Sequence, residues 1–324
     1  MQKSLVNCMK TAVVAIGGNA ILRAGEEATL QNQMSNLRET SDHLARMIKN
    51  GYDMVLTHGN GPQVGDILLQ NELAMAEVPP MPLDVCVAES QGFIGYMIQQ
   101  TLGEALTRAK VKKVVTCVLT RVLVDADDPA FERPTKPVGP FYSEQRANEL
   151  RQQKGWDFIK DSKRGGYRRV VPSPRPLAII EKSGIRRMVF GGVDQAEVVV
   201  ASGGGGIPVI MQDGVLRGVE AVVDKDLAAA VLAIGIEEKL FIMLTDVDNV
   251  YIDFNSKTPR PIFDIELAEF ERLYEQGQFP AGSMGPKAEA AMTFLRNGGE
   301  RVIITSTEKL DAALEGRAGT RISR

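Results

Sequence analysis

Residues 12–19 of the chain read AVVAIGGN, five apolar residues that lead directly into two glycines and an asparagine. A short apolar run that ends in turn residues predicts a buried strand over 12–16. A glycine pair in that position lets the backbone approach a bound phosphate and point N–H groups at it. Gly17, Gly18 and Asn19 are therefore candidate ligands of an anion, although a glycine pair alone is also typical of a plain turn.

Similar apolar runs follow along the chain and alternate with amphipathic stretches of helical spacing. The further strands that these runs predict cover residues 53–58, 113–119, 187–190, 208–211, 239–245 and 301–305. Between the first two strands, apolar residues from Leu30 to Ile48 are spaced as on one face of a helix, and Asn50 and Gly51 supply a stop signal. This alternation predicts an α/β fold built on a mostly parallel sheet.

Composition limits the kinds of protein that this chain can be. Its 324 residues carry 38 basic and 41 acidic side chains, and the net charge of -3 argues against a nucleic-acid or membrane-surface partner. The apolar stretches reach only about ten residues, about half of what a membrane span needs. Cys8, Cys86 and Cys117 form no CxxC pair and only two histidines are present, so we expect reduced thiols, no metal held by protein side chains and a cytoplasmic location.

A second junction between a strand and glycines occurs at residues 58–62, which read HGNGP. The proline is well placed as the first residue of a helix that ends near residue 76. In a parallel sheet both junctions lie at the carboxyl ends of strands, where ligands bind, so Gly59, Asn60 and Gly61 are further candidate anion ligands. His58 is a conceivable general base, but phosphoryl transfer to an already ionised acceptor needs none.

Two later glycine clusters have a similar character. Residues 202–208 read SGGGGIP, and four consecutive glycines favour contact with an anion or a sharp chain reversal over a mere turn. Residues 282–287 read GSMGPK and open a helix predicted over 287–297, so glycine amides, a helix N-terminus and Lys287 converge on whatever anion binds there. Met284 and Gly285, within this cluster, are candidate nucleotide ligands.

Two polar segments lie beside the predicted strands and helices of the C-terminal part. Asp224, Lys225 and Asp226 precede a helix predicted over 227–234 and place a cation between two carboxylates, a pattern that also fits a helix cap with an exposed lysine. Residues 245–251 close a strand with polar groups that can hold a nucleotide base, a ribose or a Mg²⁺ shell, or simply form a turn. The candidate nucleotide ligands there are Thr245, Asp246, Val247, Asp248 and Tyr251.

Residues 121–171 interrupt the alternation of strands and helices. They combine acidic residues, prolines in loops and a basic cluster at Lys160, Lys163, Arg164, Arg168 and Arg169. We expect this segment to leave the main sheet as a flap or small subdomain. We interpret the basic cluster as a solvated face.

Taken in this order, the segments resemble those of the amino acid kinase superfamily, and from residue 13 to 305 the chain resembles the carbamate kinases. Three further stretches carry the resemblance: ESQGFIGY at 89–96, PTKPVGPF at 134–141 and RRVVPSP at 168–174. The last two are specific to carbamate kinases within the superfamily. The resemblance implies reversible phosphoryl transfer between ATP and carbamate, giving ADP and carbamoyl phosphate.

The resemblance also implies an architecture, an open αβα sandwich in two lobes with a mostly parallel central sheet. Residues 1–215 would form an N-terminal lobe that binds carbamate or carbamoyl phosphate, with a protruding subdomain at about 121–171. Residues 216–324 would form the lobe that binds ATP or ADP together with Mg²⁺. A homodimer is expected on the same ground.

Roles for single residues follow from the resemblance. Lys225 and Lys287 would neutralise the transferring phosphoryl group, Asp226 would orient both lysines, and Lys136 would contact the phosphate or carbamoyl group as the flap closes. Many superfamily members carry a lysine directly after the first glycine pair, where this chain has Asn19, so Lys225 would supply that charge from elsewhere. Backbone amides of the two glycine junctions would hold the acceptor and the moving phosphate.

Three other functions remain open. Another acid kinase of the superfamily, such as an acetylglutamate kinase, would share the glycine junctions but not the PTKPVGPF stretch. A catalytically inactive relative that senses nucleotide would lack the lysines that this chain keeps. A dinucleotide-dependent oxidoreductase would need a GxGxxG after a strand, and the sequence contains neither that fingerprint nor GxxxxGK[ST].

Overall fold

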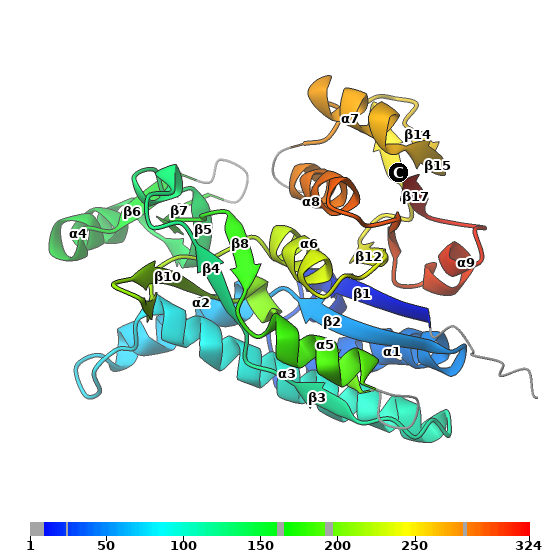
Figure 1. Ribbon diagram of the computed structural model, residues 1–324. Coiled ribbons are helices and arrows are strands. Elements are labelled where there is room, and N and C mark those ends of the chain that lie inside the picture. The colour runs from blue at the N-terminus through cyan, green and yellow to red at the C-terminus, as the bar shows by residue number, and fades with distance from the viewer. Residues whose placement is uncertain (1–9, 24, 161–164, 192–196, 281–283) are drawn as a thin grey trace, which may run out of the picture.

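The computed structural model of the chain describes residues 10–23, 25–160, 165–191, 197–280 and 284–324 (Figure 1). Its centre is an eight-stranded sheet in the order β15-β17-β16-β12-β1-β2-β9-β3, counted over these described ranges. The central strands β1 (Lys10–Ile16), β2 (Tyr52–His58) and β12 (Leu240–Thr245) pair in parallel, so their carboxyl ends lie at one edge.

The outer strands extend this sheet on both sides. β9 (Val198–Val200) and β3 (Val115–Cys117) continue it beyond β2 with parallel pairing. β16 (Arg301–Ser306) continues it beyond β12, and β17 (Thr320–Ser323) then runs antiparallel before β15 (Asp264–Glu266) closes the edge. The prediction of a mostly parallel sheet is confirmed.

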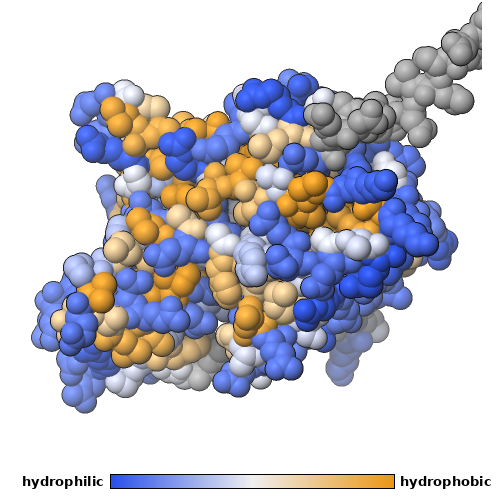
Figure 2. Space-filling view, turned by 90° about the horizontal axis from the view of Figure 1, so that it is seen from below, coloured by the Kyte–Doolittle hydropathy of each residue, from blue (hydrophilic) through white to orange (hydrophobic). Residues whose placement is uncertain are grey.

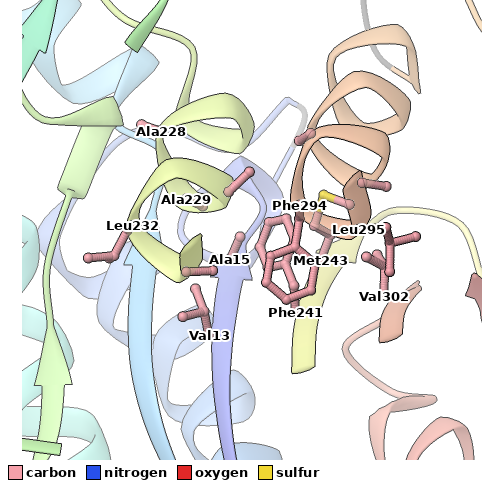
Figure 3. Packing of buried hydrophobic residues seen from close by; sticks show 14 of the residues in the cluster. Val13, Ala15, Ala228, Ala229, Leu232, Phe241, Met243, Phe294, Leu295 and Val302 are labelled. Atoms are coloured by element: carbon pink, nitrogen blue, oxygen red, sulfur yellow. The ribbon is translucent and has the colours of Figure 1, made fainter. Parts of the chain in front are cut away.

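Alternate residues of β1 build the two faces of the sandwich. Ala12, Val14 and Ile16 belong to the apolar layer under α1 (Leu30–Lys49) and α3 (Leu83–Arg108). Val13 and Ala15 point to the other face, under α6 and α8 (Figure 3). Because successive side chains of a strand point to opposite faces, an all-apolar run such as this must be covered on both sides. The predicted αβα sandwich is thus confirmed.

Helices α6 and α8 cover the second face of the sheet. α6 (Lys225–Gly235) packs small alanines against β1 and β2, which allows a close approach of helix and sheet. α8 (Met284–Arg296) places Phe294 edge-on to Phe241 of β12, with ring centroids 5.6 Å apart. α7 (Leu267–Glu275) and α9 (Leu310–Leu314) complete the C-terminal part.

The strand predicted at 187–190 is wrong, because these residues end helix α5 (Lys182–Phe190). Ile185 and Val189 are buried four residues apart, the spacing of one helical face, while the residues between them are less buried. The run MVF was too short to separate a strand from a helix by its apolar character. The helix predicted from residue 30 to 48 and its stop at Asn50 are confirmed by α1.

Three smaller sheets accompany the main one in the described residues, and the smallest is the hairpin of β13 (Val250–Ile252) and β14 (Arg260–Ile262). β4 (Arg121–Val124), β8 (Pro176–Ile179), β10 (Ile207–Gln212) and β11 (Val215–Gly218) form a four-stranded sheet, so the strand predicted at 208–211 exists but lies outside the main sheet. β5 (Lys136–Tyr142), β7 (Tyr167–Val171) and β6 (Asp157–Lys160) form a three-stranded sheet with α4 (Glu144–Lys154).

The three-stranded sheet stands at one end of the molecule, at the upper left of Figure 1, away from α7 and α9. It lies within the segment predicted to leave the main sheet, whereas β4 at the start of that segment belongs to the four-stranded sheet. The predicted lobe boundary after residue 215 falls in the antiparallel hairpin of β10 and β11. The division into two lobes stays a prediction.

The basic cluster is not uniformly solvated. Arg169 is buried, lies 4.0 Å from the centroid of the Trp156 ring and donates to Glu220 at 3.2 Å, so the solvated interpretation is wrong for it. Arg168 is half-buried and donates to the carbonyl of Gly139 at 3.2 Å. Lys160 is exposed, as predicted, and Lys163 and Arg164 lie outside the described residues.

Two further expectations concern the cysteines, expected as reduced thiols, and the helices, none of which was expected to span a membrane. Cys86 and Cys117 are free thiols, and burial raises the pKa of Cys86 to about 11, which makes it a poor nucleophile. Cys8 lies outside the described residues. In the described ranges, every helix is too short or too polar to cross a membrane.

Candidate active site

A cleft of about 740 Å³ opens at the carboxyl ends of β1, β2 and β12. Most of the predicted site residues line it, although they come from segments spread over the whole chain. The predicted residues in the lining are Gly17, Gly18, Asn19, Gly59, Asn60, Gly61, Lys136, Lys225, Asp226, Thr245, Asp246, Val247, Tyr251, Met284 and Lys287.

Two predicted nucleotide ligands, Asp248 and Gly285, are not part of the cleft lining in the described structure. The Asp248 carboxylate accepts a hydrogen bond from the Ser306 hydroxyl at 2.6 Å, which ties it to the end of β16. The N–H of Gly285 donates to the carbonyl of Pro280 at 2.8 Å. Both residues therefore bond to other parts of the protein, and they fix segments whose neighbouring residues line the cleft.

The first glycine junction needs Gly17 for a steric reason. A Cβ at this position would lie 2.9 Å from the carbonyl oxygen of Leu244, because β12 runs directly alongside. Gly18 then begins a short 3-10 turn, η1 (Gly18–Ala20), that turns the chain away from β1. The backbone of this junction is left open to the cleft.

The second junction is held from behind by other segments. α2 (Gly61–Ala74) begins within it, one residue before the predicted Pro62. The Asn60 amide donates to the hydroxyl of Ser90 on α3 at 2.8 Å, and both groups are buried. A Cβ on Gly59 would lie 3.2 Å from Lys225 Cδ, so glycine leaves room for that lysine.

The glycine run at 203–206 packs against this second junction. A Cβ at Gly203 would overlap the imidazole of His58, and one at Gly204 would overlap the amide of Asn60. Gly204 has a φ of 64°, a conformation that favours glycine. Close packing thus accounts for the glycines, and only Gly204 of this run reaches the cleft lining in the described residues.

The centre of the cleft holds one carboxylate between two ammonium groups. Lys225 Nζ lies 2.7 Å from Asp226 Oδ1, and Lys287 Nζ lies 2.9 Å from Asp226 Oδ2. Only 5% of the Asp226 side chain, 18% of Lys225 and 11% of Lys287 is exposed. The interpretation of Lys225 as an exposed lysine is therefore wrong, and α6 and α8 are joined at their N-terminal turns.

The two lysines keep the Asp226 carboxylate ionised. Burial by itself raises the pKa of Asp226, but the charges and hydrogen bonds of Lys225 and Lys287 outweigh it and hold the pKa well below its ordinary value. Burial lowers the pKa of Lys225, which Asp226 partly restores and Lys287 depresses further. Two ammonium groups and one carboxylate leave a net positive charge that attracts an anion.

A third lysine reaches the cleft from the three-stranded sheet. Lys136 Nζ lies 2.9 Å from Asp224 Oδ2. The other oxygen of this carboxylate caps α6, accepting from the backbone N–H of Asp226 at 2.9 Å, so the helix-cap interpretation of Asp224 is confirmed. Lys136 is therefore paired with Asp224, the residue directly before Lys225.

His58 lies behind the cleft and is 1% exposed. Its Nδ1–H donates to the carbonyl of Gly59 at 2.9 Å. Burial lowers the pKa of His58 to about 4, the hydrogen bond to Gly59 opposes this, and Lys225 adds to the lowering. The imidazole is therefore neutral and faces the glycine run, so it is not placed to act on a ligand.

The sequence did not single out several cleft residues that lie near Tyr251 and Met284. Phe254 is half-exposed and tilted against Tyr251, with ring centroids 6.0 Å apart. The other lining residues on this side include Asn255, Gln278, Phe279 and Pro280. Two aromatic residues, Tyr251 at the end of the polar segment 245–251 and Phe254 three positions later, were a usable signal for a flat ligand such as a base.

The chain is similar over nearly its whole length to proteins of one known family. The model of the amino acid kinase family matches residues 10–306. The carbamate kinases of Pyrococcus furiosus and Pyrococcus horikoshii are each 46% identical to this chain, over 97% and 96% of it and over 99% and 98% of their own lengths. The solved structure of carbamate kinase from Giardia lamblia bound to AMP-PNP has a TM-score of 0.91 and 42% identity, covering 98% of this chain and 99% of that one.

Proposed function

The chain belongs to the amino acid kinase family, and from that premise we propose that it is a carbamate kinase. It transfers a phosphoryl group between ATP and carbamate, giving ADP and carbamoyl phosphate. The observation that carries the site assignment is the buried Asp226 carboxylate between Lys225 and Lys287 in a cleft lined by glycine junctions. Such a site offers positive charge and backbone N–H groups but no placed base.

The reaction needs no base because carbamate is already an anion. A carbamate oxygen forms a bond to the γ-phosphorus while the bond from that phosphorus to the β,γ-bridging oxygen breaks, and the electron pair stays on ADP. Negative charge spreads over the phosphoryl oxygens and the bridging oxygen during transfer. Positioned cations that neutralise this charge therefore supply most of the catalysis.

We assign this neutralisation to Lys225 and Lys287, which approach from α6 and α8. Asp226 fixes the direction of both ammonium groups through its two oxygens. The backbone amides of Gly17, Gly18, Gly59, Asn60 and Gly61, with Asn19, would hold the acceptor and the moving phosphate. The residues that would border the nucleotide are Thr245, Asp246, Val247, Tyr251 and Met284.

Mg²⁺ fits this site as an ion that arrives with the nucleotide. In the described residues there is no group of three or more His, Cys, Asp or Glu side chains that could hold a metal. Mg²⁺ commonly keeps waters and takes one or two carboxylates plus substrate phosphates. The carboxylate of Asp246 lines the cleft and is available as such a ligand. The bound ion would neutralise phosphate charge.

A homodimer and a cytoplasmic location are part of the proposal. Exposed apolar side chains lie on or close to α3 and β3, which run along the bottom of Figure 1. They are Phe93, Tyr96, Val114 and Leu119. Figure 2 shows the molecule from below, with hydrophobic patches among polar residues. An exposed apolar surface of this kind supports association with a second copy.

The activity is tested by mixing the purified protein with carbamoyl phosphate, ADP and Mg²⁺ and measuring ATP. Formation of ATP at a rate proportional to enzyme concentration is expected. A protein that binds ADP but forms no ATP from carbamoyl phosphate would contradict the assignment.

A further inference from the structure

The two oxygens of the Asp224 carboxylate have different partners. Oδ1 accepts from the backbone N–H groups of Asp226 and Leu227 at 2.9 and 3.4 Å and so caps α6. Oδ2 accepts from Lys136 Nζ at 2.9 Å. One side chain therefore fixes the start of the helix that carries Lys225 and also the ammonium group of the flap lysine.

Packing and hydrogen bonds fix the backbone at both ends of the ion pair between Lys136 and Asp224. Lys136 begins β5 and pairs with Val171 of β7, while Asp224 follows Val222 by two residues. Val222, Val171 and Val138 are buried together in one small apolar cluster. The N–H of Val222 also donates to the carbonyl of Pro172 at 3.0 Å. The separation of the two backbones is thus set by packing rather than by the ion pair.

The base of β5 is also tied to the second glycine junction. α2 begins in that junction and packs against β5, where Gly65 and Gly139 lie in close contact. The anion-binding turn, the flap lysine and the N-terminus of α6 therefore form one connected unit. Within that unit, the side chain of Lys136 keeps freedom to move, since 35% of it is exposed.

We propose that Asp224 is the positioning residue for Lys136, a role that rests on the proposed kinase function. In the absence of substrate, Asp224 holds the flap ammonium at the mouth of the cleft, next to Lys225. When the phosphate of carbamoyl phosphate or ATP arrives, the ammonium moves to a phosphate oxygen by side-chain rotation. The three-stranded sheet does not have to rearrange, because its base is already packed.

If Asp224 only caps α6, its charge has no effect on Lys136. One substitution separates this capping role from the positioning role. In Asp224→Asn the side-chain oxygen can still accept from the N–H groups of α6, because asparagine caps helices as well as aspartate does. The charge that holds Lys136 is lost. Glu220→Gln is the matched control, since Glu220 is a nearby carboxylate that pairs with Arg169 and not with Lys136.

The kinetic test is a double-mutant cycle on the full-length enzyme, with carbamoyl phosphate varied and ADP saturating. Asp224→Asn should lower kcat/KM for carbamoyl phosphate roughly three- to tenfold, as expected for a partly exposed ion pair that positions a ligand group. Glu220→Gln should leave it unchanged. In a Lys136→Met background, Asp224→Asn should have no further effect, and the affinity for ADP alone should stay the same throughout.

A second readout does not depend on activity. Limited amine labelling followed by mass spectrometry measures how available the Lys136 ammonium is, with the exposed Lys160 as internal reference. Asp224→Asn should raise labelling of Lys136 several-fold relative to Lys160. Unchanged labelling would overturn the proposal, and so would an equal loss of kcat/KM in both backgrounds. A wild-type protein that labels as expected but forms no ATP would instead contradict the kinase function.

Discussion

The carboxylate of Asp226 lies 2.9 Å from the ammonium of Lys287, across a sequence separation of 61 residues. This contact brings the first turn of α8 to the first turn of α6, where Asp226 also meets Lys225. Helix N-termini favour anions, so the two ammonium groups and the two helix ends act on the same charge.

Lys287→Ala should lower turnover by about two to three orders of magnitude, because it removes one preorganised cation from the transferring phosphoryl group. Lys225→Ala should have an effect of similar size. Both can be measured as kcat for ATP formation, with circular dichroism to verify folding. Lys49→Ala, at the exposed end of α1, serves as the control. Near-normal turnover in either cleft variant would refute the role of that lysine.

Asp226→Asn should shift the alkaline limb of the pH–rate profile to lower pH. Asp226 raises the pKa of Lys225 against the effect of burial, so its loss lets the pKa of Lys225 fall further. The ammonium form would then be lost at a lower pH than in the parent protein. The measurement is kcat against pH for both proteins, and an alkaline limb that stays in place would contradict this coupling.

Acid should destabilise the protein partly through His58. In the folded state its pKa is about 4, against the ordinary value of 6.5, so the unfolded chain binds a proton in this range that the folded protein rejects. With respect to His58, the free energy of unfolding has its full value above pH 6.5. It falls by about 3 kcal/mol in all as the pH drops toward 4.

The check for His58 is a comparison of urea unfolding at pH 7 and pH 4.5 with His58→Asn, whose amide can replace the Nδ1–H donor to Gly59. The variant should lose less free energy of unfolding between the two pH values than the parent protein. Equal losses of free energy of unfolding in the two proteins would contradict a pKa of His58 that burial lowers.

Gly203→Ala should destabilise the protein by at least about 2 kcal/mol, because the added methyl group overlaps the His58 ring in a closely packed site. Gly184→Ala is the control, since a Cβ there meets nothing within 4 Å and lies in helix α5, where alanine is favoured. Thermal unfolding of both variants provides the comparison. A Gly203→Ala protein as stable as its parent would contradict the close packing.

Local sequence patterns predicted the sheet and its glycine junctions because these depend on neighbouring residues. The strand at 12–16 and the helix from residue 30 carry complete periodic signals, whereas the three apolar residues before Gly191 were too few to reveal a helix. Lys225 seemed a lone exposed lysine because Lys287, which shares the Asp226 carboxylate with it, is distant in sequence. The same holds for Lys136 and Asp224, and for the glycine run whose neighbours His58 and Asn60 come from another strand end.

The most direct test of the central claim compares acyl phosphates as phosphoryl donors to ADP in the parent protein and in Lys287→Ala. We expect carbamoyl phosphate to give ATP with far higher kcat/KM than acetylglutamyl phosphate, and we expect Lys287→Ala to lose most of that rate while still binding ADP. Equal use of both acyl phosphates, or no ATP from carbamoyl phosphate with Mg²⁺ and ADP present, would contradict the assignment.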